Sequence, residues 1–386
     1  AEPRFFPISA DAIQLQLTGT HMRGEALLRE PKSGALLSRL ALQHNLSDGR
    51  GGAQLEVEKL SFNHRLQPEA ISPVTLGVVA NVQGSLRGQG RIDWTPQGVT
   101  SSGRFSTDGL DFAAAFGPVT GLSGDINFTD LLGLVTSPGQ QVRLASVNPG
   151  VLVSDGQVRY RILPGYKLQV EGGRWPFAGG VLILEPTILD MAQAADRRLT
   201  FGVEGLDAGR FIAAMRFENI TATGTYDGHL PMIFDAAGGR IEGGRLVARG
   251  GGTLSYVGDV SNGDLGLISR FAFDALKSMR YDRLSIDLNG AIDGDVITRI
   301  SFAGVNQAPI EGGRTKLPIK ILGASNLPFV FNVTITAKFR QLFDMARSFN
   351  DPSILINRLI PKLEPVPRPA APDPKPVHPA ESSPKP

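Results

Sequence analysis

The sequence contains no cysteine, which excludes a disulfide scaffold, a cysteine-based zinc site and a cysteine nucleophile. The formal net charge of +2 is too small to favour nucleic acid, and we expect no nucleic-acid partner. No apolar run approaches the roughly 20 residues that a helix needs to span a bilayer. The chain begins at Ala1 without an initiator methionine or a signal-like segment. We therefore expect a fragment or a processed chain whose membrane anchor lies upstream.

The sequence also lacks the G-x-S-x-G, H-E-x-x-H and P-loop motifs of common enzyme classes. His229 follows Asp227-Gly228, which favours a turn, although a hydrolytic site at His229 stays open as an alternative. The oxygens of Asp287–Asp295 miss the EF-hand spacing, and Asp293-Gly294 fits a hairpin turn better than a calcium loop. Gly84–Gly90 leads into a strand, so no helix N-terminus is there to hold a phosphate. We expect no catalytic residue, no metal and no cofactor.

Glycine, by contrast, is abundant: its 46 residues recur in turn signals between short apolar segments. The stretch Val151–Pro186 shows the pattern most clearly. Val158, Tyr160 and Ile162 alternate with polar residues, and the alternation resumes after a turn at Pro164-Gly165. Strict period-two alternation between turn signals predicts strands with one apolar and one solvent-facing side. Because most of the chain repeats this pattern, the sequence predicts a mainly β protein.

A few departures from this pattern predict hairpin turns and helices. Asp48-Gly49 and Asp293-Gly294 stand at hairpin positions. Asp207 fits the N-cap of a short helix, and Thr129 fits the N-cap of a single helical turn. The expected helical segments are 207–215, the turn 129–134, the longest helix at 266–281, and two amphipathic helices at 338–349 and 353–359.

Gly and aromatic residues recur in an order that resembles the C-terminal domain of the YdbH-type proteins, which belong to the AsmA-like, TamB-related group of bacterial envelope proteins. The residues that carry the resemblance are Gly172–Gly180, Gly224–Pro231 with Gly239–Leu246, Phe273–Tyr281, Gly290–Gly294 through Phe302–Gln307, and Asn326–Asn332. An older label for this domain is dicarboxylate transport. We find no residue-level support for that label, because no paired arginine site is evident.

The resemblance implies a fold and an organisation of the chain. The fold is an elongated, strongly curved antiparallel sheet that forms an open, taco-like groove, with a few short helices near the C-terminal end. Residues 1–124 are then a β-groove segment that continues from a missing N-terminal part, and 125–360 are the YdbH-like β-groove domain with helices. Residues 361–386, of which 10 are proline, are expected to form an extended, disordered tail.

The resemblance also implies a function, namely a lipid-transfer conduit in the periplasm of a Gram-negative bacterium. Such a protein carries phospholipid between the inner and outer membranes. It is held in the inner membrane by an N-terminal anchor, which this chain lacks, and a small outer-membrane lipoprotein adds β-strands to its C-terminal end. Exposing acyl chains to water costs about 0.8 kcal/mol per methylene, which a continuous apolar face can offset without a catalytic residue.

The alternating pattern predicts which side chains line such a groove. The predicted lining residues are Val158, Tyr160, Ile162, Leu168, Val170, Leu182, Leu184, Leu199, Phe201, Val203, Leu246, Leu284, Ile286 and Leu288. The alternative is a non-catalytic envelope assembly module that binds a partner by β-strand addition at an open edge. In that case the sheet would be filled by its own helices, including Leu267, Phe271 and Leu276.

Overall fold

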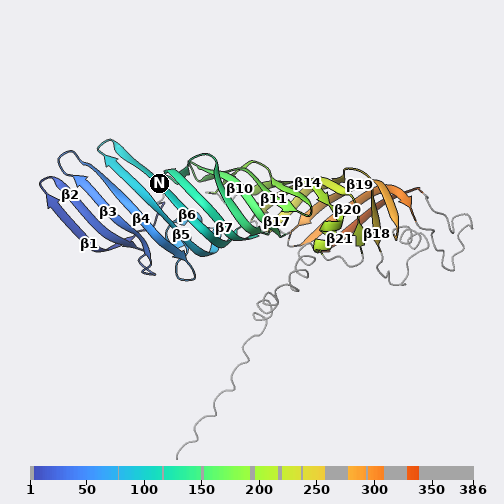
Figure 1. Cartoon of the computed structure of the whole chain (residues 1–386), viewed down its shortest axis with the longest axis horizontal. Coiled ribbons are helices and arrows are strands. Elements are labelled where there is room, and N and C mark those ends of the chain that lie inside the picture. Colours follow the sequence, from blue (N-terminus) through green and yellow to red (C-terminus); the bar gives the residue numbers. More distant parts are fainter. Residues whose placement is uncertain are drawn as a thin grey trace, which may run out of the picture. The chain divides into compact units, whose positions relative to one another are not determined.

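A computed structural model describes residues 4–76, 78–114, 117–148, 152–191, 196–215, 220–235, 238–256, 277–292, 294–307 and 328–338. Within these ranges the chain forms one sheet of 21 strands, and every pairing is antiparallel (Figure 1). The sheet is open rather than closed into a barrel, because β1 pairs only with β2 and β21 only with β20 among the described strands. The predicted fold class, a curved and open antiparallel sheet, is confirmed.

The strands follow one another in chain order along most of the sheet. Their bounds are β1 Ser9–Thr18, β2 His21–Arg29, β3 Leu36–Asn45, β4 Arg50–Phe62, β5 Val79–Thr95, β6 Gly98–Ala114, β7 Gly117–Asp130, β8 Val135–Thr136, β9 Gln140–Val147, β10 Val153–Leu163, β11 Lys167–Phe177, β12 Gly180–Leu184, β13 Thr187–Asp190, β14 Arg197–Asp207, β15 Ile220–Ala222, β16 Thr225–Asp235, β17 Gly238–Ala248, β18 Gly252–Tyr256, β19 Met279–Ala291, β20 Asp295–Asn306 and β21 Pro328–Lys338. Two short 3-10 turns, η1 Pro68–Ala70 and η2 Pro73–Thr75, lie between β4 and β5.

The connections are mostly tight turns at the predicted places. Gly49 closes the β3–β4 turn with φ of 70°, and Gly165 closes the β10–β11 turn with φ of 77°. Both angles lie in the left-handed region, which glycine enters without a steric penalty. The β19–β20 hairpin also forms where it was predicted, although Asp293 lies outside the described residues. Because each connection is short, successive strands pair side by side with alternating direction.

The short helix α1 (Ala208–Met215) forms as predicted, and Asp207 caps it. The Oδ1 of Asp207 accepts a hydrogen bond from the backbone N–H of Arg210 at 2.7 Å, which satisfies one of the free donors of the first turn. The helical turn predicted at 129–134 is wrong in its start and its cap, because the chain forms only a turn at 131–134, closed by a hydrogen bond from Leu134 N to Leu131 O. Thr129 and Asp130 still belong to β7, and it is Asp130 that accepts from Gly133 N at 2.9 Å.

The end of the predicted helix at 266–281 is wrong. Residues 266–276 lie outside the described part of the chain, as do the helices predicted at 338–349, apart from the strand end at Lys338, and at 353–359. Met279 and Tyr281, however, open strand β19 and are both fully buried, while Arg280 between them is exposed. This is period-two burial, so strand pairing with β18 and β20 overrides the helical spacing of the apolar residues.

The buried tyrosines Tyr226 of β16 and Tyr281 of β19 form a polar contact inside the apolar cluster. Their hydroxyl oxygens lie 2.7 Å apart, and the Tyr281 hydroxyl donates to the carbonyl of Thr223 at 2.6 Å. Since Tyr281 has a single hydroxyl proton, Tyr226 must donate to Tyr281. Gly252 gives the Tyr281 ring its space, because a Cβ at that position would collide with the phenol. Burial raises the pKa of both phenols.

We expect Tyr281→Phe to lower the free energy of unfolding by about 1–3 kcal/mol, because it leaves both Thr223 and Tyr226 without their partner. Tyr226→Phe is the matched control, since it keeps the bond between Tyr281 and Thr223 and should cost less. Urea denaturation of the two variants measures the difference. Equal stability of Tyr281→Phe and the parent protein would contradict this account of the pair.

Candidate functional site: the inner face of the sheet

One face of the sheet, here called the inner face, carries the apolar residues of successive strands in register. Residues directly opposite one another in antiparallel strands share a face, so the pairings trace rows across the sheet. One row runs through Val158, Gly173, Leu184, Phe201 and Leu230. A parallel row runs through Trp175, Leu182, Val203, Gly228, Leu246, Ile286 and Ile300.

The structure brings the predicted lining residues together on this inner face. Seven of them are buried in one cluster that extends from β7 to β20: Val170, Leu182, Leu184, Leu199, Phe201, Val203 and Leu284. Five more are half-buried and pack against that cluster: Val158, Leu168, Leu246, Ile286 and Leu288. Tyr160 and Ile162 are half-buried beside them, opposite Val170 and Leu168. Their contact with lipid stays a prediction.

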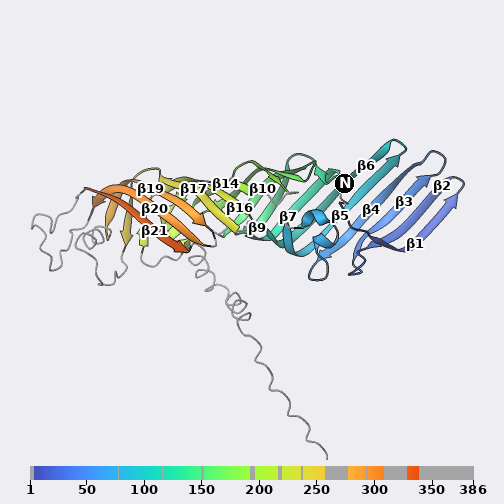
Figure 2. The ribbon, with the colours of Figure 1, turned by 180° about the vertical axis from the view of Figure 1, so that it is seen from behind.

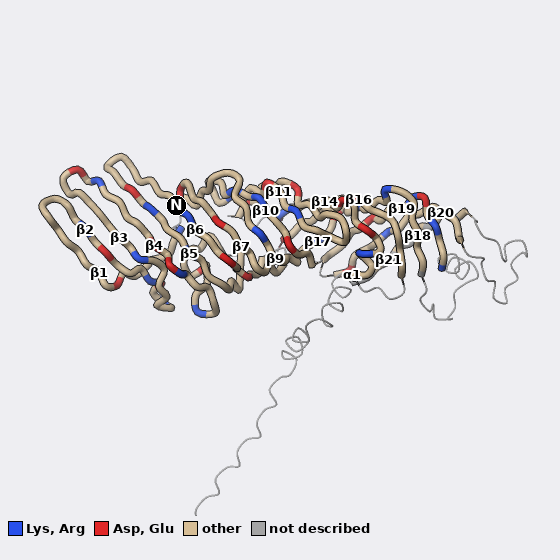
Figure 3. The backbone as a smooth tube through the Cα atoms, viewed as in Figure 1, with Lys and Arg blue, Asp and Glu red and all other residues tan. Residues whose placement is uncertain are grey.

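The opposite, outer face carries charged residues, several of which form ion pairs within a strand or with a neighbouring strand. Figure 3 shows that positively and negatively charged residues are interspersed along the described strands. His229 belongs to this outer face, where it lies opposite Gly202 and Arg245 and is exposed. Its Nδ1 lies 3.2 Å from a carboxylate oxygen of Glu185. Within the described part of the chain, histidines and carboxylates form no group that could hold a metal ion. His229 therefore lies on the opposite face of the sheet from the apolar cluster.

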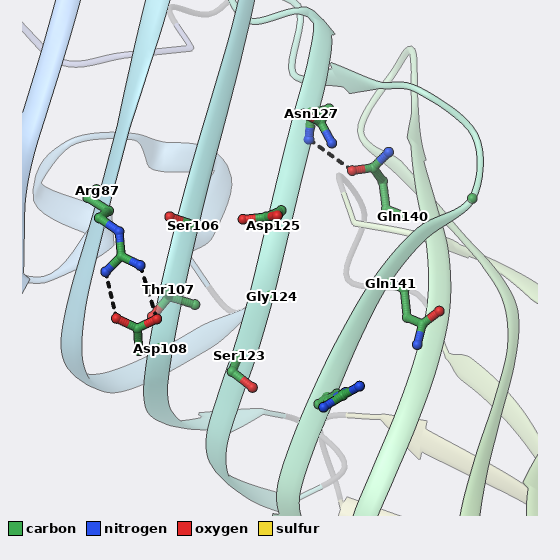
Figure 4. A pocket seen from close by; sticks show the side chains of 12 residues that line it. Arg87, Ser106, Thr107, Asp108, Ser123, Gly124, Asp125, Asn127, Gln140 and Gln141 are labelled. Carbon is green, nitrogen blue, oxygen red and sulfur yellow. Dashed lines mark hydrogen bonds and ion pairs between the residues drawn. The ribbon is translucent and has the colours of Figure 1, made fainter.

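A polar depression of about 500 Å³ lies on the outer side of β5–β9 (Figure 4). Its wall includes the ion pair between Arg87 and Asp108, whose atoms approach to 2.6 Å. The hydrogen bond from Arg87 holds the pKa of Asp108 below its usual range. Arg104 and Asp125 form a second pair at 2.9 Å. These exposed pairs neutralise one another and offer no apolar surface, so the depression does not continue the inner face.

Exposure of the inner face changes along the sheet. Near its N-terminal edge Leu15 and Leu17 of β1 are 64% and 61% exposed, whereas Trp175 and Val203 are only 2% and 3% exposed. Leu15 lies in a row with Gly24, Leu42, Ala53 and Ile92, so it belongs to the same inner face. The inner face is thus open to solvent at β1, and it is covered by its own side chains from β10 onward.

Sequence reasoning placed every lining residue at or after Val158 and missed the open stretch. The signal was nonetheless present, because Ile13-Gln-Leu-Gln-Leu17 alternates as clearly as any later segment. Alternation identifies the apolar face of a strand but says nothing about what covers it. Exposure in the folded chain was needed to single out Leu15 and Leu17.

A comparison with protein families identifies the chain once this geometry is known. The profile of the YdbH-like family, described as intermembrane phospholipid transport protein YdbH, matches residues 5–360. The chain belongs to the YdbH-like family. Comparisons with curated proteins and with solved structures gave no significant match. No helix within the described residues is long and apolar enough to cross a membrane. Membership in the YdbH-like family and the open sheet both fit lipid transfer.

Tyr160 offers a spectroscopic test of how deeply the inner face is buried. Burial raises the pKa of the Tyr160 phenol to about 12, against an ordinary value of 10.0. Because the pKa of Tyr160 is raised in the folded state, the stability that its neutral phenol contributes is complete below pH 10 and is lost as the pH rises towards 12. Over that window we expect the Tyr160 phenol to account for a loss of up to about 3 kcal/mol.

Tyr160→Phe cannot ionise at this position, so it should lack this loss. The unfolding free energies of the two proteins are compared at pH 9 and pH 11.5, which lie about 1 unit below and about 1.5 units above the ordinary pKa of tyrosine. Difference absorbance of the phenolate in the two proteins reports ionisation of Tyr160 itself. Ionisation of Tyr160 near pH 10 would show that the position is open to water.

Proposed function

We propose that the chain is a periplasmic lipid-transfer conduit in which phospholipid acyl chains lie along the inner face between the inner and outer membranes. The observation that carries the proposal is the mainly apolar inner face, which can be followed through paired strands from exposed Leu15 in β1 to half-buried Ile300 in β20. The choice of phospholipid as cargo follows from the family of the chain, which transports phospholipid between membranes. In this proposal the chain acts by binding and has no catalytic step.

The energetics of a lipid favour such a face over a single deep pocket. Each methylene that leaves a bilayer for water costs about 0.8 kcal/mol, so an acyl chain needs apolar contact at every point of its path. Rows of Leu, Ile, Val and Phe supply that contact without polar specificity. The charged head group would stay in water at the edges of the sheet, because burying an unpaired charge costs far more than an acyl chain gains.

The two ends of the sheet suggest how the conduit is connected. Strand β21 has an unpaired edge among the described residues, and Val330 on it is 78% exposed. An open edge of this kind accepts a further strand through backbone hydrogen bonds. We propose that a small outer-membrane lipoprotein adds its strands there and that an upstream segment anchors the protein in the inner membrane. The same open edge is what favours the alternative function, an envelope assembly module.

We expect Leu15→Asp to reduce bound phospholipid by about tenfold or more, because a carboxylate would replace an apolar side chain beside the acyl chain. Gln16→Asp is the matched control: it carries the same charge one residue further on, where the exposed side chain faces the other side of β1. Both positions are exposed, so neither change should disturb folding. Native mass spectrometry of the full chain, after incubation with phosphatidylethanolamine vesicles, counts the bound lipid.

Equal lipid loading of Leu15→Asp, Gln16→Asp and the parent chain would show that the inner face of β1 does not hold lipid. A parent chain that carries no lipid at all would favour the assembly module, because its apolar side chains would then serve only to stabilise the sheet.

A further inference from the structure

Among the described residues, the N-terminal segment and the β4–β5 connection reach across the inner face between β5 and β10. In an antiparallel meander the connections alternate between the two sides of the sheet at which the strands end. These two sides are called its long edges. The β4–β5 connection therefore leaves from one edge, and the β7–β8 and β10–β11 turns leave from the other. Segment 63–76, which is part of the β4–β5 connection, is seen beside β5 with its two short helical turns in Figure 2. We call this segment the roof.

The roof is held firmly at its own edge. Leu66 is 2% exposed and packs in a cluster with Val57, Phe62 and Val82 of β4 and β5. The side chain of Gln67 accepts from Val82 N at 2.8 Å and donates to Val82 O at 2.9 Å, so it takes the place of a strand partner for β5. Detaching the roof from β4 and β5 would expose a buried apolar cluster. We therefore call this attachment the fixed side of the roof.

Arg4 joins the roof to the opposite edge. The backbone of the N-terminal segment pairs with the roof, since Phe6 N donates to Ile71 O at 2.9 Å and the Ser72 hydroxyl donates to Arg4 O at 2.6 Å. The Arg4 side chain donates to Leu132 O at 3.0 Å in the β7–β8 turn. It also donates to the Tyr166 hydroxyl at 3.2 Å in the β10–β11 turn and stacks on that ring.

The receiving edge is preorganised for this contact. Ser101 donates its hydroxyl proton to Asp130 at 2.7 Å and accepts from Leu132 N at 2.9 Å, which fixes the turn that presents the Leu132 carbonyl. The side chain of Leu131 in the same turn lies over Gly90 and Gly103 of the inner face, where an added Cβ would meet it. Both edges thus fold over the groove, and Arg4 closes the gap between them.

The two attachments differ greatly in strength. The fixed side buries apolar residues. The Arg4 side consists of an exposed guanidinium that donates to two neutral oxygens and is attracted by the Asp130 carboxylate. A hydrogen bond from a charged donor changes an equilibrium by roughly 10- to 100-fold, and exposure to solvent keeps its effect near the lower figure. Opening at Arg4 is therefore accessible while the rest of the sheet stays folded, as expected of elements that move for function.

We propose that Arg4 is the latch of a roof that divides the groove into an open stretch at β1–β4 and a packed stretch from β10 onward, and that lipid passes only when the latch opens. This inference rests on the proposed conduit function. In this proposal Arg4, Leu132 and Tyr166 form the gate. Segment 63–76 is the barrier, and it swings about its fixed side at β4 and β5.

The absence of cysteine from the chain allows a direct test. Arg4→Cys and Tyr166→Cys are combined in the full chain and joined by a bismaleimide whose spacer contains a disulfide. Before linking, the latch is open; after linking, it is locked; and reduction of the spacer opens it again in the same molecules. A photo-cross-linker placed at Leu15 reports lipid in the open stretch, and one placed at Ile286, or at Leu246 as a second position, reports lipid beyond the roof.

With radiolabelled phosphatidylethanolamine in donor vesicles, we expect the locked protein to label fully at Leu15 and at least about tenfold less beyond the roof, with recovery on reduction. Arg4→Ala should speed labelling beyond the roof about three- to tenfold. Arg23→Ala removes another exposed arginine, on β2, and should change nothing. Undiminished labelling beyond the roof in the locked protein overturns the gate but leaves the conduit standing. No labelling at either position overturns the conduit and the gate together.

Discussion

A sheet satisfies its backbone by lateral pairing, but that pairing leaves open what covers its apolar side. In a β-sandwich a second sheet covers it. Here the described strands form a single sheet, and the cover changes along its length. Between β10 and β20 the side chains of the face pack into one cluster, and segment 63–76 packs on it beside β4 and β5. Leu15 and Leu17 are more than half exposed. The other properties of the chain follow from this uneven cover of one continuous face.

Local patterns in the sequence were enough to predict many of the strands, several turns and the cap of α1, although β2 and β9 were missed. They also identified the face on which residues such as Val158 and Phe201 lie, because side-chain direction in a strand depends only on parity. They failed where pairing partners decide the structure. In the sequence Met279 continues the helical spacing of Leu267, Phe271 and Leu276, and only the strands on either side of β19 settle the outcome. Arg4 illustrates a second limit of prediction from local patterns. Its hydrogen-bond partners lie 128 and 162 residues away, and no local pattern indicates them.

The packed stretch from β10 onward need not oppose passage of a lipid. Its half-buried residues, such as Leu246 and Ile286, exchange contacts with neighbouring side chains for contacts with an acyl chain, and both partners are aliphatic. The net cost of the exchange is therefore small, provided that the rows separate without exposing apolar surface to water. Polar contacts behave differently. The hydroxyls of Tyr226 and Tyr281 would lose partners that an acyl chain cannot replace, so this pair is expected to stay closed while the surrounding aliphatic rows adjust.

The chemistry of the latch connects the cargo to its passage. The Arg4 guanidinium donates hydrogen bonds to a backbone carbonyl and a phenol, which are neutral acceptors, and the Asp130 carboxylate attracts it electrostatically. In the proposed conduit a head group would pass close to it in water. A phosphate accepts from a guanidinium through charge-assisted and often bidentate bonds, which are roughly twice as strong as bonds to neutral groups. A phospholipid that reaches the roof therefore brings a better partner for Arg4 than the two oxygens that hold it. In such an exchange the cargo itself supplies the free energy that opens the roof, and a neutral lipid with the same acyl chains would lack the means to do so.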